Sequence, residues 1–404
     1  MNKEISIKYC FLQGMYWMLA AVAMAYMTPL LEAKGFTGIE IGYLSAVKYL
    51  SVIVFQMIIG SFADRHLKTI PVKYIIIGLS VLGIIFAALF WNTGHNMFMA
   101  TISLIVFGAT INCASPLVDS LSIQYMNHGV RLNYTVSRAC GSICWAVFCV
   151  IVGIISDKLG TNNILLFQML AATLFVVAAF IMNPIDYTKE PIKDISESKE
   201  KSKSKKVHSN WYLIANFPKY TLFLIGLVLL FAAYNMNTTF LVNVFENLGG
   251  NHFHYGMAQF VLSMAEVPVA LVFYKIKNKI SIDKLMLICS IFSLLRATAT
   301  TFAPNVPLLI FAQIFEIGGF SIFYAGSVFY VTDYLPINDS VKGTSLINLA
   351  GMGLGDMIGS IMCGIIKERW GMSTLMKDSL IVGTFAVVVM LIMVKFPAGK
   401  KDNR

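Results

Sequence analysis

Charged side chains are scarce in this sequence. Asp, Glu, Lys and Arg make up only 13% of its 404 residues, whereas water-soluble globular proteins carry about 25%. Apolar runs of twenty or more residues recur along almost the whole chain. Each run is long enough to cross a hydrocarbon core about 30 Å thick as a helix. The scarcity excludes a soluble globular protein, and the runs predict a multi-pass membrane protein.

Several chemical signatures are also missing. The seven Cys residues are odd in number, lie inside apolar segments and show no CxxC spacing, so we interpret them as free thiols rather than metal ligands. The sequence contains no GxxxxGK[ST], HExxH or GxSxG motif, and its six His residues fall in loops or at the edges of apolar runs. We therefore expect no enzymatic activity, no bound metal and no cofactor.

The apolar runs predict an all-α membrane protein with twelve transmembrane helices in two pseudo-symmetric six-helix halves. The expected spans are residues 9–31, 41–63, 73–91, 97–122, 135–156, 163–183, 221–245, 255–275, 284–302, 306–332, 341–366 and 375–396.

The basic residues predict the orientation. Of the 31 Lys and Arg residues, 23 fall at the two ends and in the alternate loops on the same side, five fall in the opposite loops, and three lie inside spans. Short loops rich in Lys and Arg stay in the cytoplasm, so both termini are expected to be cytoplasmic. This bias also explains the net charge of +10 without a nucleic-acid partner.

A polar segment and an internal repeat divide the chain. Residues 184–220 form the only long polar stretch and are expected to be a flexible cytoplasmic linker between halves 1–183 and 221–396, with a cytoplasmic tail at 397–404. The sequence GIISDKLG at 153–160 returns as GIIKERWG at 364–371. Chance similarity of two helix ends is the alternative, but two parallel halves are typical of rocking transporters, which bind substrate near mid-membrane.

Seven ionisable residues lie within or at the edge of the apolar spans. Each costs at least about 2.5 to 3.5 kcal/mol at mid-bilayer unless it is paired or hydrated, which marks it as a functional candidate. Four carboxylates face three cations, so one carboxylate is in excess and burial favours its protonated form. This balance suits a proton-coupled carrier, and static ion pairs between helices are the alternative. The seven residues are Lys48, Asp119, Arg138, Glu266, Arg296, Glu316 and Asp356.

Trp145 follows Arg138 by seven positions, so the two lie on one face of the same expected helix. An indole beside a guanidinium offers a stacking surface next to hydrogen-bond donors, which suits the apolar face and the hydroxyls of a sugar ring. The alternative is a Trp that only packs in the interior.

These residues resemble the lactose permease group of proton-coupled sugar symporters in the major facilitator superfamily. Pro116-Leu-Val-Asp119 matches the group's Pro followed by an acid, and Arg138, Gly141 and Trp145 match its Arg, Gly and Trp at equal spacing. The resemblance implies that Asp119 and Arg138 bind sugar hydroxyls and that Trp145 stacks on the ring. Carriers of aromatic acids or nucleosides look similar here but usually have Phe where this chain has Trp145.

The second half of the sequence also matches the lactose permease group at several positions. Tyr234, Glu266 and Arg296 match positions tied to substrate recognition and proton coupling, and Glu316 matches the group's proton-carrying carboxylate. Gln313 stands where lactose permease has a His, so its hydrogen bonding to substrate is expected to differ. Arg296 is expected to favour the ionised form of Glu316 when the two approach.

Four further residues are candidates for gating. Gly60-Ser-Phe-Ala-Asp64-Arg65 resembles the superfamily signature Gly-x-x-x-Asp-Arg/Lys, which implies that Asp64 caps a neighbouring helix N-terminus. Lys48 and Asp356 lie at similar expected depths on spans that face each other in the superfamily, which predicts an ion pair between the halves. A pair of Lys48 with Asp119 is the alternative.

Together these features predict a secondary active transporter that imports a sugar or glycoside with a proton by alternating access. A carrier of aromatic acids or nucleosides is the alternative within transport, and a membrane-embedded enzyme is the alternative class. The expected partners are a small-molecule substrate and membrane lipid, with a monomer as the functional unit. The expected location is the plasma (inner) membrane.

Overall fold

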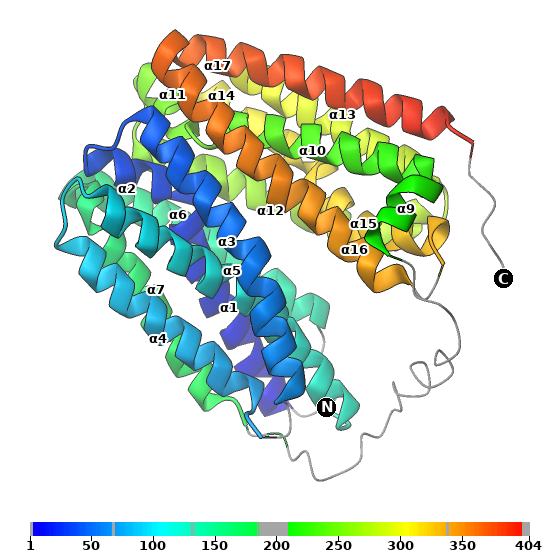
Figure 1. The fold of residues 1–404 in the computed structure, drawn as a ribbon. Coiled ribbons are helices and arrows are strands. Elements are labelled where there is room, and N and C mark those ends of the chain that lie inside the picture. Colours follow the sequence, from blue (N-terminus) through cyan, green and yellow to red (C-terminus); the bar gives the residue numbers. More distant parts are fainter. Residues whose placement is uncertain are drawn as a thin grey trace. The chain divides into compact units, whose positions relative to one another are not determined.

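The computed structural model describes residues 3–66, 69–130, 132, 134–183, 185, 209–336 and 339–397, without the side chains of 3, 64, 135, 270, 271, 274, 321, 328 and 341. This part of the chain is helical, with no strand (Figure 1). Its helices are α1 Lys3–Ala25, α2 Met27–Ala33, α3 Gly38–Arg65, α4 Val72–Trp91, α5 Met97–Asn127, α6 Tyr134–Leu159, η1 Thr161–Asn163, α7 Ile164–Ile181, α9 Asn210–Asn216, α10 Pro218–Thr238, α11 Leu241–Asn247, α12 His252–Lys277, α13 Ile282–Thr301, α14 Val306–Ala312, η2 Gln313–Gly318, α15 Phe320–Tyr334, α16 Ser340–Asn348, η4 Leu349–Gly355 and α17 Asp356–Lys395.

The all-helical class is therefore confirmed, and a helix lies over each of the twelve expected ranges. By length and hydropathy alone, eight of the described helices could cross a membrane, or nine when the bent pair of α1 and α2 is counted as one span. The count of nine falls below the expected twelve for two reasons. Helical turns continue from 342 to 395 through a kink at Gly371, which merges two expected spans. In addition, α12 and α13 are not among the eight. The number twelve stays a prediction.

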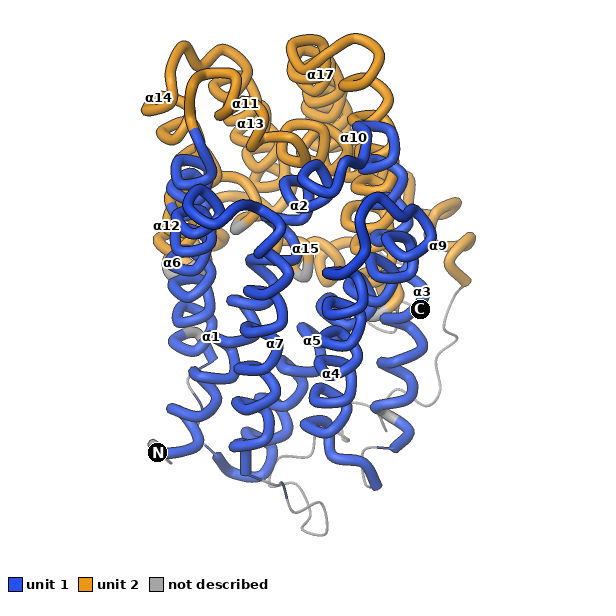
Figure 2. Tube along the Cα trace, turned by 90° about the vertical axis from the view of Figure 1, so that its left-hand side faces the viewer, with its two compact units in different colours: residues 1–199, 251–260 blue, residues 200–250, 261–404 orange. Residues whose placement is uncertain are grey.

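The chain forms two compact units (Figure 2). Unit 1 contains residues 1–199 and 251–260, and unit 2 contains residues 200–250 and 261–404. The start of α12 thus packs with unit 1, although the expected division placed this whole helix in the second half.

In unit 1, α1 packs against α6 and α7, α3 packs against α5, and α4 packs against α5 and α7. Small residues bring α1 and α6 close together, since a Cβ atom on Gly14 would lie 2.9 Å from the Cys144 sulfur. Local signals fix helix starts. Thr37 and Glu40 form a capping box at the start of α3, and the Asn96 side chain caps α5.

In unit 2, α10 and α13 both pack against α17, and α13 also contacts α15. Two expected spans are interrupted here. The tighter turns of η2 separate α14 from α15, and the wider turns of η4 separate α16 from α17. Mid-helix interruptions of this kind often mark functional positions. The candidate proton carrier, Glu316, lies on η2.

Most of the expected linker lies outside the described residues, as does the tail from 398 onward. The described residues at the end of the linker range are mostly helical, whereas a flexible segment was expected there. They form helix α9, whose first turn is capped by the Ser209 side chain, and the start of α10 at Pro218.

Candidate functional site

Asp119, Arg138 and Trp145 belong to one cluster in unit 1. Asp119 lies on α5, one turn after the helix-interior Pro116, and the other two residues lie on α6. Asp119 Oδ1 accepts hydrogen bonds from Tyr134 Oη at 3.0 Å and from Gln13 Nε2 at 3.2 Å. All three predicted side chains are partly exposed. They can therefore contact a ligand in this conformation.

Two residues of α1 complete this cluster and were missed by the sequence analysis. Trp17 lies 5.9 Å from Trp145, ring centroid to centroid, in an edge-to-face arrangement. The Arg138 guanidinium lies over the Trp17 ring, 3.9 Å from its centroid. Gln13 accepts a hydrogen bond from the Trp17 indole nitrogen at 3.2 Å. The sequence did carry a signal for these two residues. Gln13 and Trp17 place an amide and an indole one turn apart in an otherwise apolar span.

Arg138 and Asp119 do not pair with each other within the described part of the chain. The carboxylate is held by neutral donors, and the guanidinium rests on an indole. Both groups consequently keep hydrogen-bonding capacity for a ligand, because neither neutralises the other in an ion pair. The alternative pair of Lys48 with Asp119 is likewise not among the Asp119 hydrogen bonds and ion pairs of the described residues.

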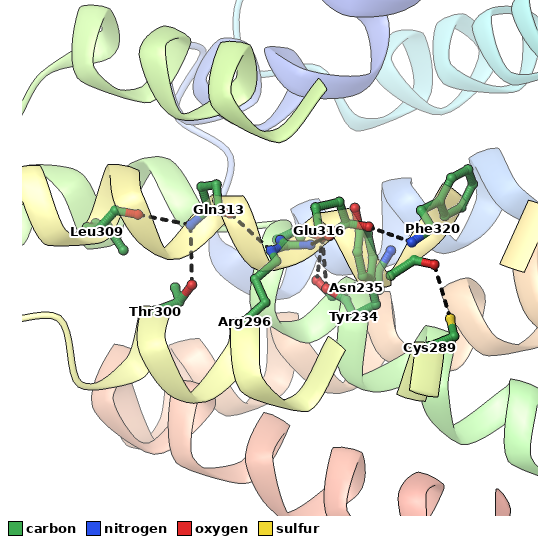
Figure 3. A network of polar contacts seen from close by, with 11 residues as sticks. Tyr234, Asn235, Cys289, Arg296, Thr300, Leu309, Gln313, Glu316 and Phe320 are labelled. Atoms are coloured by element: carbon green, nitrogen blue, oxygen red, sulfur yellow. Dashed lines mark hydrogen bonds and ion pairs between the residues drawn. The ribbon is translucent and has the colours of Figure 1, made fainter. Parts of the chain in front are cut away.

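The second cluster lies in unit 2 and centres on a buried ion pair (Figure 3). Arg296 Nη1 on α13 donates to Glu316 Oε2 on η2 at 2.7 Å. The two residues are only 2% and 1% exposed, respectively. Two charges buried this deeply must contact each other directly, because burial of either charge alone carries a large desolvation free energy. The predicted association of Arg296 with Glu316 is present in the structure.

Neighbouring groups fix both partners of this pair. Gln313 Oε1 accepts from Arg296 Nε at 3.0 Å, and Gln313 Nε2 donates to Thr300 Oγ1 and to the Leu309 carbonyl oxygen (Figure 3). Gln313 is fully buried, so in this conformation it orients Arg296 instead of facing a ligand. The Phe320 backbone N–H, at the start of α15, donates to Glu316 Oε1 at 3.0 Å. Glu316 therefore also caps α15.

A small cavity adjoins the ion pair. Tyr234 lines it together with Glu316, and the Arg296 guanidinium lies 4.6 Å from the centroid of the Tyr234 ring. Gly318 allows η2 to approach α13, since a Cβ atom there would lie 2.2 Å from the Phe292 ring. The remaining lining residues are Leu230, Phe231, Cys289, Ser293, Phe320 and Phe323.

Of the other predicted residues, Glu266 lies near the second cluster, close enough to Tyr234 to interact with it electrostatically. Glu266 is half-buried on α12, two residues before Pro268. Lys48 lies over the Tyr49 ring at 4.8 Å, and Asp356 Oδ1 accepts from Asn235 Nδ2 at 3.5 Å. The Asp64 side chain is outside the described part of the molecule, and Arg65 is exposed at the end of α3.

No group of three or more His, Cys, Asp or Glu side chains that could hold a metal ion is present among the described residues. Both clusters combine fixed charges, amides and aromatic rings inside apolar helices. Ionisable residues inside membrane helices commonly mark pathways for substrates, ions or protons.

Comparison with known proteins decides the family. The model of the MFS_1 like family matches residues 5–376, which is most of the chain. The protein belongs to this family of the major facilitator superfamily. It is therefore a multi-pass membrane transporter of small molecules and not an enzyme.

Individual relatives are distant. This transporter is 22% identical over 388 residues to the maltose permease of Geobacillus stearothermophilus, which covers 94% of this chain and 93% of that protein. Among solved structures, a single-substitution variant of the nucleoside transporter NupG matches with a TM-score of 0.80 at 14% identity, covering 97% of this chain and 99% of the other. The unsubstituted NupG matches with a TM-score of 0.77 at 14% identity, over 98% and 100% of the chains. At such identity these structures establish the fold alone.

Proposed function

We propose that this transporter takes up a sugar or glycoside together with a proton by alternating access. The observation that carries the proposal is the unit 1 cluster. Arg138 lies over the Trp17 indole, which meets the Trp145 ring edge to face. Gln13 links Trp17 to Asp119. Among these described residues, Arg138 and Asp119 form no ion pair with each other. Charged hydrogen-bonding groups next to an aromatic face suit a sugar, which has hydroxyls at its rim and an apolar C–H face. The maltose permease relative supports this substrate class.

The buried pair in unit 2 supports proton coupling. Arg296 donates to the Glu316 carboxylate, and protonation of Glu316 would weaken that contact. A proton gained or lost at Glu316 therefore changes which groups Arg296 can contact. This transporter would need no cofactor beyond the proton.

A nucleoside is the second candidate substrate. A nucleobase also stacks on an indole, and ribose hydroxyls can bond to Asp119 and Arg138. The solved nucleoside transporters share the fold but do not distinguish the two substrates. We prefer the sugar because Trp145 stands where carriers of aromatic acids and nucleosides usually have Phe.

Uptake into vesicles separates these candidates. The purified full-length chain is reconstituted into liposomes with an alkaline interior and supplied with labelled maltose, uridine or a phenylpropanoid acid. We expect maltose to accumulate above its external concentration and a protonophore to abolish the accumulation. Arg138→Lys is the matched variant, since it keeps the charge but loses the planar bidentate fork. Accumulation of uridine with no uptake of maltose would assign the nucleoside function instead.

We also propose a functional monomer in the plasma (inner) membrane with both termini in the cytoplasm. The support for the orientation is the strong bias of Lys and Arg toward one set of loops. Reporter fusions after Phe396 and after residue 250 should report opposite sides of the membrane. Equal reporter activity at the two points would contradict this orientation.

A further inference from the structure

Arg138, Gly141 and Trp145 form a surface of α6 against which a side chain from another helix packs. At spacings of three and four residues the three positions share one face of α6. Trp17 of α1 lies on this face. It contacts the guanidinium at 3.9 Å from the ring centroid, and its ring lies 5.9 Å from the Trp145 ring.

Gly141 is what allows Trp17 to reach this position. A Cβ atom at Gly141 would lie 2.3 Å from Trp17 Cδ1 and 3.0 Å from two other indole atoms. Such distances are too short for any side chain, so an alanine would force the indole away from α6. The glycine of the motif therefore serves the contact with Trp17.

Gln13 connects the same indole to the carboxylate of the site. It lies one turn before Trp17 on α1, accepts from the indole nitrogen, and donates to Asp119 Oδ1. The Gln13 amide also donates to Tyr9 Oη at 3.0 Å, and Tyr9 in turn donates to the Val118 carbonyl oxygen. Gln13 itself is buried. One face of α1 consequently holds both charged groups of the cluster.

We propose that Trp17 is a positioning residue of the unit 1 substrate site. Its ring holds the Arg138 guanidinium away from Asp119 and sets the orientation of Trp145, while Gln13 holds Asp119. The two charged groups are thereby kept separate and ready for substrate hydroxyls. Release of a guanidinium from a neutral ring is easier than the breaking of a direct ion pair in a medium of low dielectric constant. The identity of the substrate rests on the proposed function, but the positioning does not.

The first test needs no substrate. Arg138 in the purified full-length transporter is modified with phenylglyoxal, and mass spectrometry measures the rate at each arginine. We expect Trp17→Leu and Gly141→Ala to raise the Arg138 rate severalfold, because each removes the ring from the guanidinium. The Arg296 rate should not change and verifies that unit 2 stays folded. Trp211→Leu, at an exposed position on α9, is the matched control. An unchanged Arg138 rate in Trp17→Leu would overturn the proposal.

The second test uses maltose as the probe. We expect Trp17→Leu and Gly141→Ala each to weaken binding at least tenfold. The double variant should be no weaker than the poorer single variant, because both substitutions remove one contact. Trp17→Phe keeps an aromatic face and should stay within threefold of the parent. Additive losses in the double variant would overturn the positioning role.

The two tests separate this inference from the proposed function. If the parent binds no maltose, the sugar assignment fails and phenylglyoxal still measures the positioning of Arg138. If the parent binds maltose and the Arg138 rate is insensitive to Trp17, the positioning role fails and the sugar assignment stands.

Discussion

Each carboxylate oxygen of Glu316 accepts a hydrogen bond from a different group. Protonation of Glu316 would affect these two contacts. Oε2 receives Arg296 Nη1, and Oε1 receives the Phe320 backbone N–H. A proton on Glu316 would remove the negative charge that these two donors contact. In the proposed function, protonation would therefore weaken the hold on Arg296 and on the start of α15.

The substitution Glu316→Gln tests this residue directly. The amide keeps one acceptor oxygen but has no proton to release, so uphill accumulation of substrate should be lost while exchange across the membrane continues. Counterflow and pH-driven uptake in the same liposomes measure the two activities. Glu246→Gln, at an exposed position of α11, is the control and should behave as the parent does. A Glu316→Gln variant that still concentrates substrate would move the proton site elsewhere, with Glu266 as the next candidate.

The proposal of a sugar and not a nucleoside as the substrate depends on Trp145. Removal of its indole by Trp145→Ala should weaken sugar binding by about 1 to 3 kcal/mol, which combines lost stacking with lost apolar contact. Titration calorimetry of the purified transporter measures the affinity, and Trp211→Ala serves as the control for loss of an exposed indole. Unchanged affinity in Trp145→Ala would remove the argument for a ring stacked on this residue.

At the scale of elements, a second buried ion pair joins three helices of unit 2. Lys219 Nζ at the start of α10 lies 2.6 Å from Asp283 Oδ2 in the first turn of α13. Tyr334 Oη near the end of α15 donates to the same oxygen at 2.5 Å. Lys219 falls within the linker range expected from the sequence, because composition does not show where a residue packs.

Disruption of this pair should destabilise unit 2. Asp283→Asn leaves the Lys219 ammonium buried without its counter-ion, which typically costs about 3 to 5 kcal/mol. The double variant Lys219→Met with Asp283→Leu removes both charges and should recover most of the loss. Thermal unfolding in detergent, followed by circular dichroism, compares the midpoints of the parent and both variants. If the double variant is as unstable as Asp283→Asn, the pair is needed for its geometry and not for charge balance.

At the scale of the whole molecule, Lys48 and Asp356 are two buried charged residues that do not belong to either cluster. Lys48 is 9% exposed and rests on Tyr49, and Asp356 is 9% exposed and accepts from Asn235. The sequence predicts an ion pair between the halves that closes the outer side of the substrate cavity. That pair stays a prediction.

Removal of both charges tests this gate. Lys48→Met with Asp356→Leu should shift the conformational balance toward the outward-facing state and leave substrate affinity largely intact, because neither residue belongs to the unit 1 cluster. Reactivity of single Cys probes introduced on each side of the membrane measures the balance. Loss of substrate binding with no change in probe reactivity would place Lys48 in the substrate site and end the gate hypothesis.

The sequence by itself determined the membrane environment, the all-helical class and the residues that carry charge into the apolar spans. These properties are local. Hydrophobic runs of sufficient length have only the helix available in lipid, because backbone groups there must be satisfied within the segment. Helical periodicity also placed Arg138 and Trp145 on one face, and the resemblance to the lactose permease group added Gly141.

The tertiary structure decided which side chains meet these residues. Trp17 and Gln13 are more than one hundred positions from Asp119 and Arg138 along the chain, and only the packing of α1 against α5 and α6 brings them together. Likewise, the conformation of η2 makes Gln313 a partner of Arg296. Contacts between helices depend on relative rotation and depth, which small residues such as Gly141 set by permitting close approach. No local sequence pattern encodes them.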